Sequence, residues 1–257
     1  MWAIAKYTFL EFWRKKIILT ILFIACVLLC GAAIAGGLSL GEQTKVIRDI
    51  AFAVIQLAGI VMTLFFGSYL LADEIKQQTL YLLLSKNSSR ARIVLGKYLG
   101  FALVLVLFRV LMSIALYALL ARYGIARTFL YLYALGGLLI SRLVTLSIVM
   151  FFSTFVSPFV TLLTTLIITL LGYTMSFVIY YTTVLKTAVF SPFFVRSMKI
   201  VYFLIPNFVP ISMADFLDVP FVQSVIASQF FLATCMHIAY SIVVLIVAIG
   251  IFQKKEL

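Results

Sequence analysis

Long stretches without a charged residue alternate with short basic clusters along this chain. The four longest contain 25, 23, 43 and 35 residues and cover Ile17–Gly41, Ile50–Ala72, Leu143–Leu185 and Val219–Gln253. About 20 apolar residues suffice to cross a bilayer, so each run predicts at least one transmembrane helix. The 43-residue run would be about 65 Å long as one helix, roughly twice the hydrocarbon thickness, so we expect it to fold back at Ser157-Pro158.

The pattern predicts an all-α polytopic membrane protein. Of its 257 residues 65% are hydrophobic and 11% are charged, with a mean hydropathy of +1.22. A soluble domain of this size leaves too much surface wet to hide so many apolar side chains. We find no internal repeat or linker and predict one transmembrane domain, 1–257, with six transmembrane helices at 17–39, 50–72, 98–121, 129–153, 159–183 and 229–252.

Two further segments complete the predicted fold. Residues 1–16 mix five aromatic side chains with basic ones, which is typical of an interfacial helix in the headgroup region. The alternative is that this helix simply extends the first span. Residues 184–228 are apolar but contain four prolines, which favours short re-entrant helices in the outer leaflet over a continuous span.

The basic residues indicate membrane topology. A net charge of +12 raises the question of nucleic acid, but the charges lie in clusters beside the spans rather than on a polar domain, so no nucleic-acid partner is expected. With both termini cytoplasmic, the predicted loops place eleven basic residues inside and seven outside. Basic residues prefer the cytoplasmic side, so we predict a multi-pass cell (inner) membrane protein with both termini cytoplasmic.

The densest polar stretch is the predicted cytoplasmic loop at 73–97. It reads DEIKQQTLYLLLSKNSSRARIVLGK, and its leucines at 80, 83 and 84 form an apolar stripe at helical spacing. A short amphipathic helix between two spans is suited to a groove of a cytosolic partner. A plain solvated connector remains the alternative.

This loop resembles that of the ABC-2-type transporter permeases. The residues that match the family pattern, in order and spacing, are Glu74, Thr79, Leu83, Leu84, Ser85, Ser89, Arg90, Gly96 and Lys97. The chain departs from it at Gln78, where glycine is usual, and at Asn87, where proline is usual. The N-terminal YTFLEFWRKK, the YFLIPNF segment at 202–208 and the closing IFQKKEL are also similar to family elements, so the resemblance spans nearly the whole chain.

The resemblance implies the membrane-spanning subunit of an ATP-driven transporter, most often an exporter. Such a subunit has six spans, pairs with a second permease subunit as a homodimer or heterodimer, and binds two cytosolic ATPase subunits that hold ATP and magnesium. The loop would contain the coupling helix. By the same resemblance the ATPase-coupling residues are Glu74, Thr79, Leu83, Leu84, Arg90 and Lys97.

No catalytic or metal site is predicted in this chain. A phosphate-binding loop needs Gly-x-x-x-x-Gly-Lys-Ser/Thr, but Gly96-Lys97 has Ala91 at the first glycine position and Tyr98 after the lysine. We therefore expect no ATPase activity and no cofactor in the chain itself. His237 is the only histidine, which excludes a multi-histidine metal site and favours a packing role in the last span.

Arg109 and Arg142 each fall near the middle of a predicted span, where a charge costs at least about 2.5 to 3.5 kcal/mol. All eight acidic residues lie outside the predicted spans. The remaining partners are helix carbonyls, an anionic substrate, or the hydroxyls of Ser113, Ser141 and Thr145. Our hypothesis is that one or both arginines line a translocation path and attract a lipid headgroup or other anion. Snorkelling or hydrogen bonding between helices is the alternative.

Two other functional classes remain open. The chain would also fit a membrane partner that transmits ATPase motion to an extracytoplasmic protein without transporting a solute, and the apolar 184–228 segment would then contact that protein. A channel or secondary carrier is expected to carry paired intramembrane acids or repeated halves, which the sequence lacks. The pattern does not specify a substrate.

Overall fold

The computed structural model is helical throughout the residues it describes. These are residues 1–38, 43–70, 89–123, 130–184, 193, 196–197, 200, 205–208 and 223–254. They form seven α-helices and one π-helical turn, with no strand among them: α1 (Trp2–Arg14), α2 (Ile17–Gly37), α3 (Gln43–Val61), η1 (Met62–Phe66), α6 (Arg90–Arg122), α7 (Leu130–Ser153), α8 (Pro158–Val184) and α10 (Gln223–Lys254).

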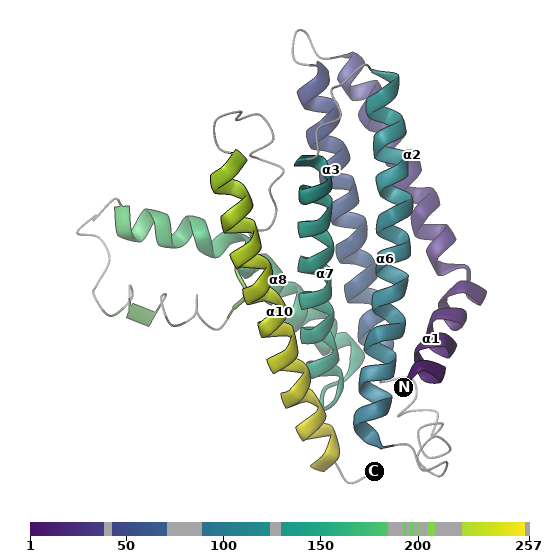
Figure 1. The fold of residues 1–257 in the computed structure, drawn as a ribbon, viewed down its shortest axis with the longest axis vertical. Helices are drawn as coiled ribbons and strands as arrows, with labels where there is room; N and C mark the ends of the chain where they lie inside the picture. Colours follow the sequence, from purple (N-terminus) through teal and green to yellow (C-terminus); the bar gives the residue numbers. More distant parts are fainter. Residues whose placement is uncertain are drawn as a thin grey trace.

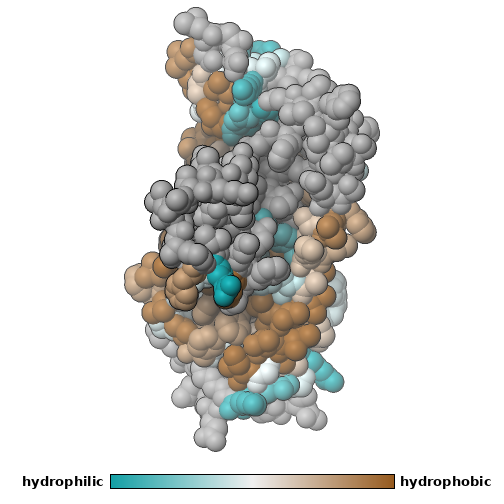
Figure 2. Space-filling model, turned by 90° about the vertical axis from the view of Figure 1, so that its left-hand side faces the viewer, coloured by the Kyte–Doolittle hydropathy of each residue, from teal (hydrophilic) through white to brown (hydrophobic). Residues whose placement is uncertain are grey.

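Five helices of the described chain are long and apolar enough to cross a membrane. They cover Leu19–Gly37, Gln43–Leu70, Arg90–Arg122, Tyr131–Ser153 and Phe230–Lys254. Large apolar side chains on these helices face outward, which is the expected arrangement where lipid replaces water. Figure 2 shows this apolar surface above a set of hydrophilic residues at the lower end of the molecule. The predicted multi-pass membrane character is confirmed.

The spanning helices lie side by side along the long axis, and both termini lie at the same end (Figure 1). We call this the basic end. It is formed by α1, the start of α6 and the last turns of α10. The described basic residues of these segments are Lys6, Arg14, Lys15, Lys16, Arg90, Arg92, Lys97 and Lys254. The first turns of α3 and the last turn of α6, at the opposite end, carry Lys45, Arg48 and Arg122.

The N-terminal segment forms a helix of its own. Lys16, between α1 and α2, adopts a left-handed backbone conformation with φ of 55°, which no continuous helix contains. The alternative that this segment merely extends the first span is therefore wrong. Helix α1 packs against α6 through Ala5, Thr8 and Phe12. A Cβ atom at Gly100 would lie 2.6 Å from the Ala5 carbonyl oxygen, so this contact depends on glycine.

Helix α6 begins at Arg90, eight residues before the predicted start of the third span at 98. Ser89 has an extended conformation (ψ of 144°) and starts the helix, and no proline interrupts the residues that follow. The last part of the predicted loop is thus the first two turns of a spanning helix. The predicted coupling helix itself falls on residues 71–88, which lie outside the described part of the chain.

The predicted fold-back at Ser157-Pro158 is confirmed. Helix α7 ends at Ser153, a turn follows, and α8 begins with Pro158 at its first position, where proline needs no backbone hydrogen bond. The predicted fifth span forms α8, whose C-terminal part extends away from the other helices (Figure 1). Its described apolar side chains cover only Pro158–Thr174, so five spans rather than six are established.

Most of the predicted re-entrant segment, 184–228, lies outside the described residues. The described part 205–208 packs into the bundle. Phe208 is fully buried, and its backbone N–H donates to the Gly172 carbonyl oxygen of α8 at 3.2 Å. Helix α10 begins at Gln223, six residues before the predicted start of the last span.

Candidate functional site: a buried pair of arginines

Two arginines from neighbouring helices meet inside the bundle. Arg109 of α6 is 5% exposed and Arg142 of α7 is 1% exposed. Both side chains border Gly59 of α3: a Cβ atom there would lie 3.4 Å from Arg142 Cδ and 3.6 Å from Arg109 Nη2. The sequence placed these residues near the middle of separate spans, and the fold brings them to one point between three helices.

One of the two guanidinium groups is held by a tyrosine. Arg142 Nη2 donates a hydrogen bond to the Tyr173 hydroxyl of α8 at 2.6 Å and a longer one to Ser141 Oγ at 3.4 Å. The Tyr173 ring also lies 5.9 Å from the guanidinium carbon. The Nε and Nη1 atoms of both arginines are buried and have no hydrogen-bond partner among the described residues. Buried donors in this state are rare because each loses its hydration without compensation.

No carboxylate of the described residues neutralises this pair. The two acidic residues within the described part of the chain are Glu11 and Asp49. Glu11 lies at the basic end and pairs with Lys15 at 2.6 Å, and Asp49 pairs with Arg48 at 2.9 Å near the opposite end. The two positively charged guanidinium groups are therefore buried near one another, and the interaction between them is repulsive.

Nearby hydroxyl groups are already engaged with helix backbone. Ser113 donates to the Arg109 carbonyl at 2.8 Å, and Thr145 donates to the Ser141 carbonyl at 2.9 Å. Thr63 in the π-helical turn donates to the Gly59 carbonyl at 2.8 Å. Of the three hydroxyls expected from the sequence to serve the arginines, Ser141 alone makes a hydrogen bond to either guanidinium group among the described residues.

The ring of Tyr173 packs against the ring of Phe208. The rings of Tyr173 and Phe208 lie 5.2 Å apart, and those of Phe208 and His237 lie 5.9 Å apart. Phe208 approaches closely because the neighbouring residue is Gly172, where a Cβ atom would lie 2.6 Å from the Pro206 carbonyl oxygen. The Pro-Asn-Phe element therefore packs against the helix face that carries the arginine's partner.

His237 is buried in α10, with Nδ1 2.6 Å from the Ala233 carbonyl oxygen. Together with its ring contact to Phe208, this agrees with the packing role expected for it. Among the described residues, no group of histidine, cysteine and acidic side chains is arranged to hold a metal ion.

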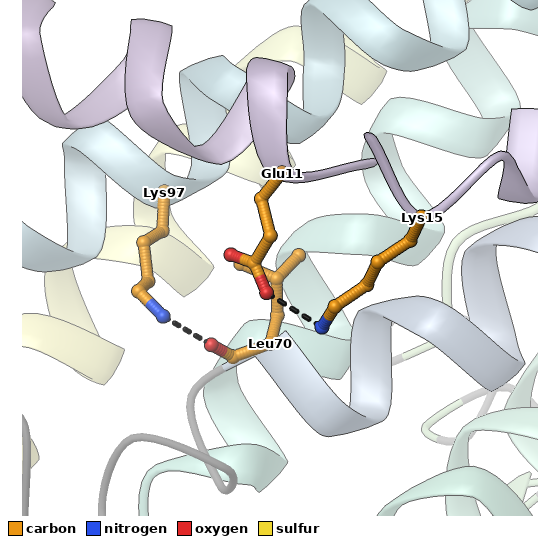
Figure 3. Close-up of polar contacts among 4 residues, drawn as sticks. All are labelled: Glu11, Lys15, Leu70 and Lys97. Carbon is orange, nitrogen blue, oxygen red and sulfur yellow. Dashed lines mark hydrogen bonds and ion pairs between the residues drawn. The ribbon is translucent and has the colours of Figure 1, made fainter. Parts of the chain in front are cut away.

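Two of the predicted coupling residues, Arg90 and Lys97, lie at the basic end. Lys97 is 4% exposed, and its amine donates to the carbonyl oxygen of Leu70, the last described residue before the loop (Figure 3). Arg90 Nη1 donates to the carbonyls of Phe252 at 3.0 Å and Gln253 at 3.2 Å. The remaining predicted coupling residues lie outside the described part of the chain: Glu74, Thr79, Leu83 and Leu84.

Sequence reasoning missed Gly59, Tyr173 and Phe208 as neighbours of the arginines. A signal for Tyr173 was present, since it continues a series of buried threonines at spacing four on α8: Thr161, Thr165 and Thr169. Residues four apart share one helix face, so this polar face had to meet protein rather than lipid. Gly59 gave no comparable signal.

The chemistry of the site is that of two guanidinium groups. Such groups stay protonated and bind oxyanions through their N–H donors. The arrangement can therefore hold an anion. Neither a scan of protein-family models nor a search of curated proteins finds a match to this chain.

Proposed function

We propose that this chain is the membrane-spanning subunit of an ATP-driven ABC-type transporter, coupled to a separate cytosolic ATPase. The observation that carries the proposal is the convergence at the basic end. Both residues that flank the 71–88 loop, the N-terminal helix and the end of α10 lie together there, beside most of the basic side chains. Basic residues favour the cytoplasmic face, which supports a cytoplasmic loop and cytoplasmic termini.

The directions of the helices support a proposal of six spans. Helix α7 runs toward the basic end, and α10 begins away from that end and returns to it (Figure 1). A further crossing between Ser153 and Gln223 would account for this return. Helix α8 lies in this interval and is apolar, so we assign it as the sixth membrane-inserted helix.

The contacts around the loop suit it to transmit force. On one side, Leu70 is bonded by Lys97 of α6, and on the other side Arg90 is bonded to the end of α10. Helix α1 is fixed to α6 at Gly100. A displacement of the loop would reach three helices through these contacts. Glu74, Thr79, Leu83 and Leu84 are the proposed contacts with the ATPase.

The remaining parts of the complex follow from the same proposal. Two ATPase copies bind ATP and magnesium, a second permease subunit completes the membrane domain, and the substrate moves outward. Arg109 and Arg142 are the candidate residues of the translocation path.

Cysteine labelling tests the topology. The natural cysteines Cys26, Cys30 and Cys235 are replaced by serine, and Ser85→Cys or Arg122→Cys is introduced singly. A membrane-impermeant maleimide should label Arg122→Cys on intact cells, and should label Ser85→Cys only after permeabilisation. Labelling of Ser85→Cys from outside would overturn the proposal.

Co-purification tests the coupling. In mild detergent, the wild-type chain should retain a vanadate-sensitive ATP-hydrolysing partner. Leu83→Glu should release it, because a charge on the apolar stripe opposes docking in an apolar groove. Arg122→Glu, a charge change at the opposite end, serves as the matched control and should retain it. Isolation of the wild-type chain in active form without any ATPase would contradict the assignment.

A further inference from the structure

The arginine pair carries two problems that no described residue solves. Four buried nitrogen atoms lack an acceptor, namely Nε and Nη1 of Arg109 and of Arg142. The two positive charges also repel one another. Water or backbone carbonyls accept hydrogen bonds but leave the repulsion in place. An anion between the side chains relieves both.

The number and arrangement of donors select the kind of anion. A guanidinium group presents its N–H donors as a planar fork that matches two oxygens of a carboxylate or phosphate. A carboxylate has two oxygens and one charge, so it serves one fork and leaves the second arginine uncompensated. A tetrahedral dianion has enough oxygens to accept from the unpartnered donors of both side chains and enough charge to offset both arginines.

We infer that Arg109 and Arg142 together form a binding site, inside the membrane domain, for one phosphate dianion. Inorganic phosphate and the phosphate monoester headgroup of phosphatidic acid both supply such a group. The site binds without any contribution from an ATPase, so it stands or falls separately from the proposed transporter assembly.

The surroundings suit this ligand. Tyr173 accepts a hydrogen bond from Nη2 of Arg142 at 2.6 Å, so this arginine offers a ligand its Nε and Nη1, which point to different edges of the guanidinium group and donate singly. Gly59 has no side chain, so both arginine side chains can lie close to the backbone of α3 at this position. The π-helical turn Met62–Phe66 begins three residues further along, and such turns often occur at functional sites.

A binding experiment on the purified full-length chain tests the inference. The protein is prepared in neutral detergent and phosphate-free buffer, and thermal unfolding is followed while inorganic phosphate is added, with potassium chloride at matched ionic strength as the reference. A second arm compares nanodiscs of pure phosphatidylcholine with nanodiscs that also contain phosphatidic acid. Stabilisation by inorganic phosphate identifies a soluble oxyanion, and stabilisation by phosphatidic acid alone identifies a lipid headgroup. Either result supports the site.

Variants assign the response to the arginines. Arg109→Gln and Arg142→Gln should each weaken binding by at least about tenfold, because each removes charge-assisted hydrogen bonds. Tyr173→Phe should weaken it less, since the arginines remain. Arg48→Gln is the matched control: Arg48 is also a buried arginine, but it pairs with Asp49 near the opposite end, so its variant should bind as the wild type does.

Folding of each variant is checked by circular dichroism and size-exclusion chromatography. Where a glutamine variant does not fold, the corresponding lysine variant replaces it, because lysine keeps the charge but loses the fork. The inference is overturned if neither phosphate nor phosphatidic acid stabilises the wild-type protein beyond chloride. It is equally overturned if the response survives in the folded Arg109 and Arg142 variants. A double-mutant cycle that couples Arg142 to Asp215 or Asp218, with no ligand response, would show an internal counter-ion instead.

Discussion

Lys97 and Arg142 are both almost completely buried cations on long apolar helices, yet their surroundings differ. Lys97 lies in the second turn of α6, and its amine reaches the carbonyl of Leu70. Arg142 lies inside α7, and two of its nitrogen atoms have no acceptor. The difference lies in the acceptors within reach. The Lys97 amine reaches a backbone carbonyl of another helix, whereas two nitrogen atoms of Arg142 reach no acceptor among the described residues.

Arg90 likewise reaches backbone acceptors, since it donates to the carbonyls of Phe252 and Gln253 in the last turn of α10. At the basic end, Lys97 and Arg90 thus bond to the backbone of other helices. In the middle of the bundle, no described residue accepts from Nε or Nη1 of either arginine. Three substitutions test this contrast, and a fourth tests the packing beside Tyr173.

Lys97→Met should have the largest effect. It leaves the Leu70 carbonyl without its charged donor, so we expect a loss of about 2 to 3 kcal/mol in the free energy of unfolding. Thermal or denaturant unfolding in detergent measures it. The exposed Lys254→Met is the control and should change stability by less than about 0.5 kcal/mol. Equal stability of the two variants would show that the hydrogen bond from Lys97 to Leu70 does not stabilise the protein.

Gly172→Ala should destabilise the protein by about 2 kcal/mol, because the new Cβ atom would lie 2.6 Å from the Pro206 carbonyl and 2.7 Å from the Phe208 ring. Gly136→Ala is the matched control within a helix. A Cβ atom there meets nothing within 4 Å, so this variant should be neutral or stabilised by up to about 1 kcal/mol. A Gly172 variant as stable as the Gly136 variant would show that the 205–208 segment does not pack tightly against α8.

Arg142→Met should act in the opposite direction from Lys97→Met. In phosphate-free neutral detergent we expect unchanged stability or a gain of about 1 kcal/mol, since an apolar side chain removes an uncompensated charge. Unfolding measurements on both variants under the same conditions compare the signs. A loss of about 3 kcal/mol or more would mean that the guanidinium group already has a strong partner within the protein.

Arg90→Gln should have the smallest effect. Its bonds to the end of α10 are partly exposed, so we expect a loss of about 0.5 to 1 kcal/mol. Limited proteolysis at the C-terminus should report increased fraying of α10. No change in the cleavage rate would argue that α10 is held by its apolar contacts alone.

The spans were predictable because hydrocarbon imposes a simple rule. Apolar length identified the helices, and Ser157-Pro158 identified the turn between α7 and α8, because proline interrupts a continuous helix. Helix starts were less predictable. Arg90 and Lys97 look like loop residues in composition, but their charged groups reach carbonyls of other helices, and the sequence does not reveal that tertiary contact.

The arginine site was predictable only in part. Arg109 and Arg142 were recognisable because charge inside an apolar run is costly. Their meeting at Gly59 depends on which faces of α3, α6 and α7 adjoin, and the uniformly apolar sequences of α6 and α7 give no reliable facing signal. The hydrogen bond from Arg142 to Tyr173 was hidden for the same reason.

Helix α6 is 33 residues long, about 50 Å, whereas the hydrocarbon layer is about 30 Å thick. The helix is therefore longer than the hydrocarbon layer, and tilting or extension into the polar layer takes up the excess length. Arg109 lies about 28 Å along this helix from Arg90, where the helix is bonded to α10. A tilt of about 5° about that point would move Arg109 by about 2.5 Å, which is more than enough to form or break a hydrogen bond. The contacts of the buried arginines are therefore sensitive to small changes in the tilt of α6.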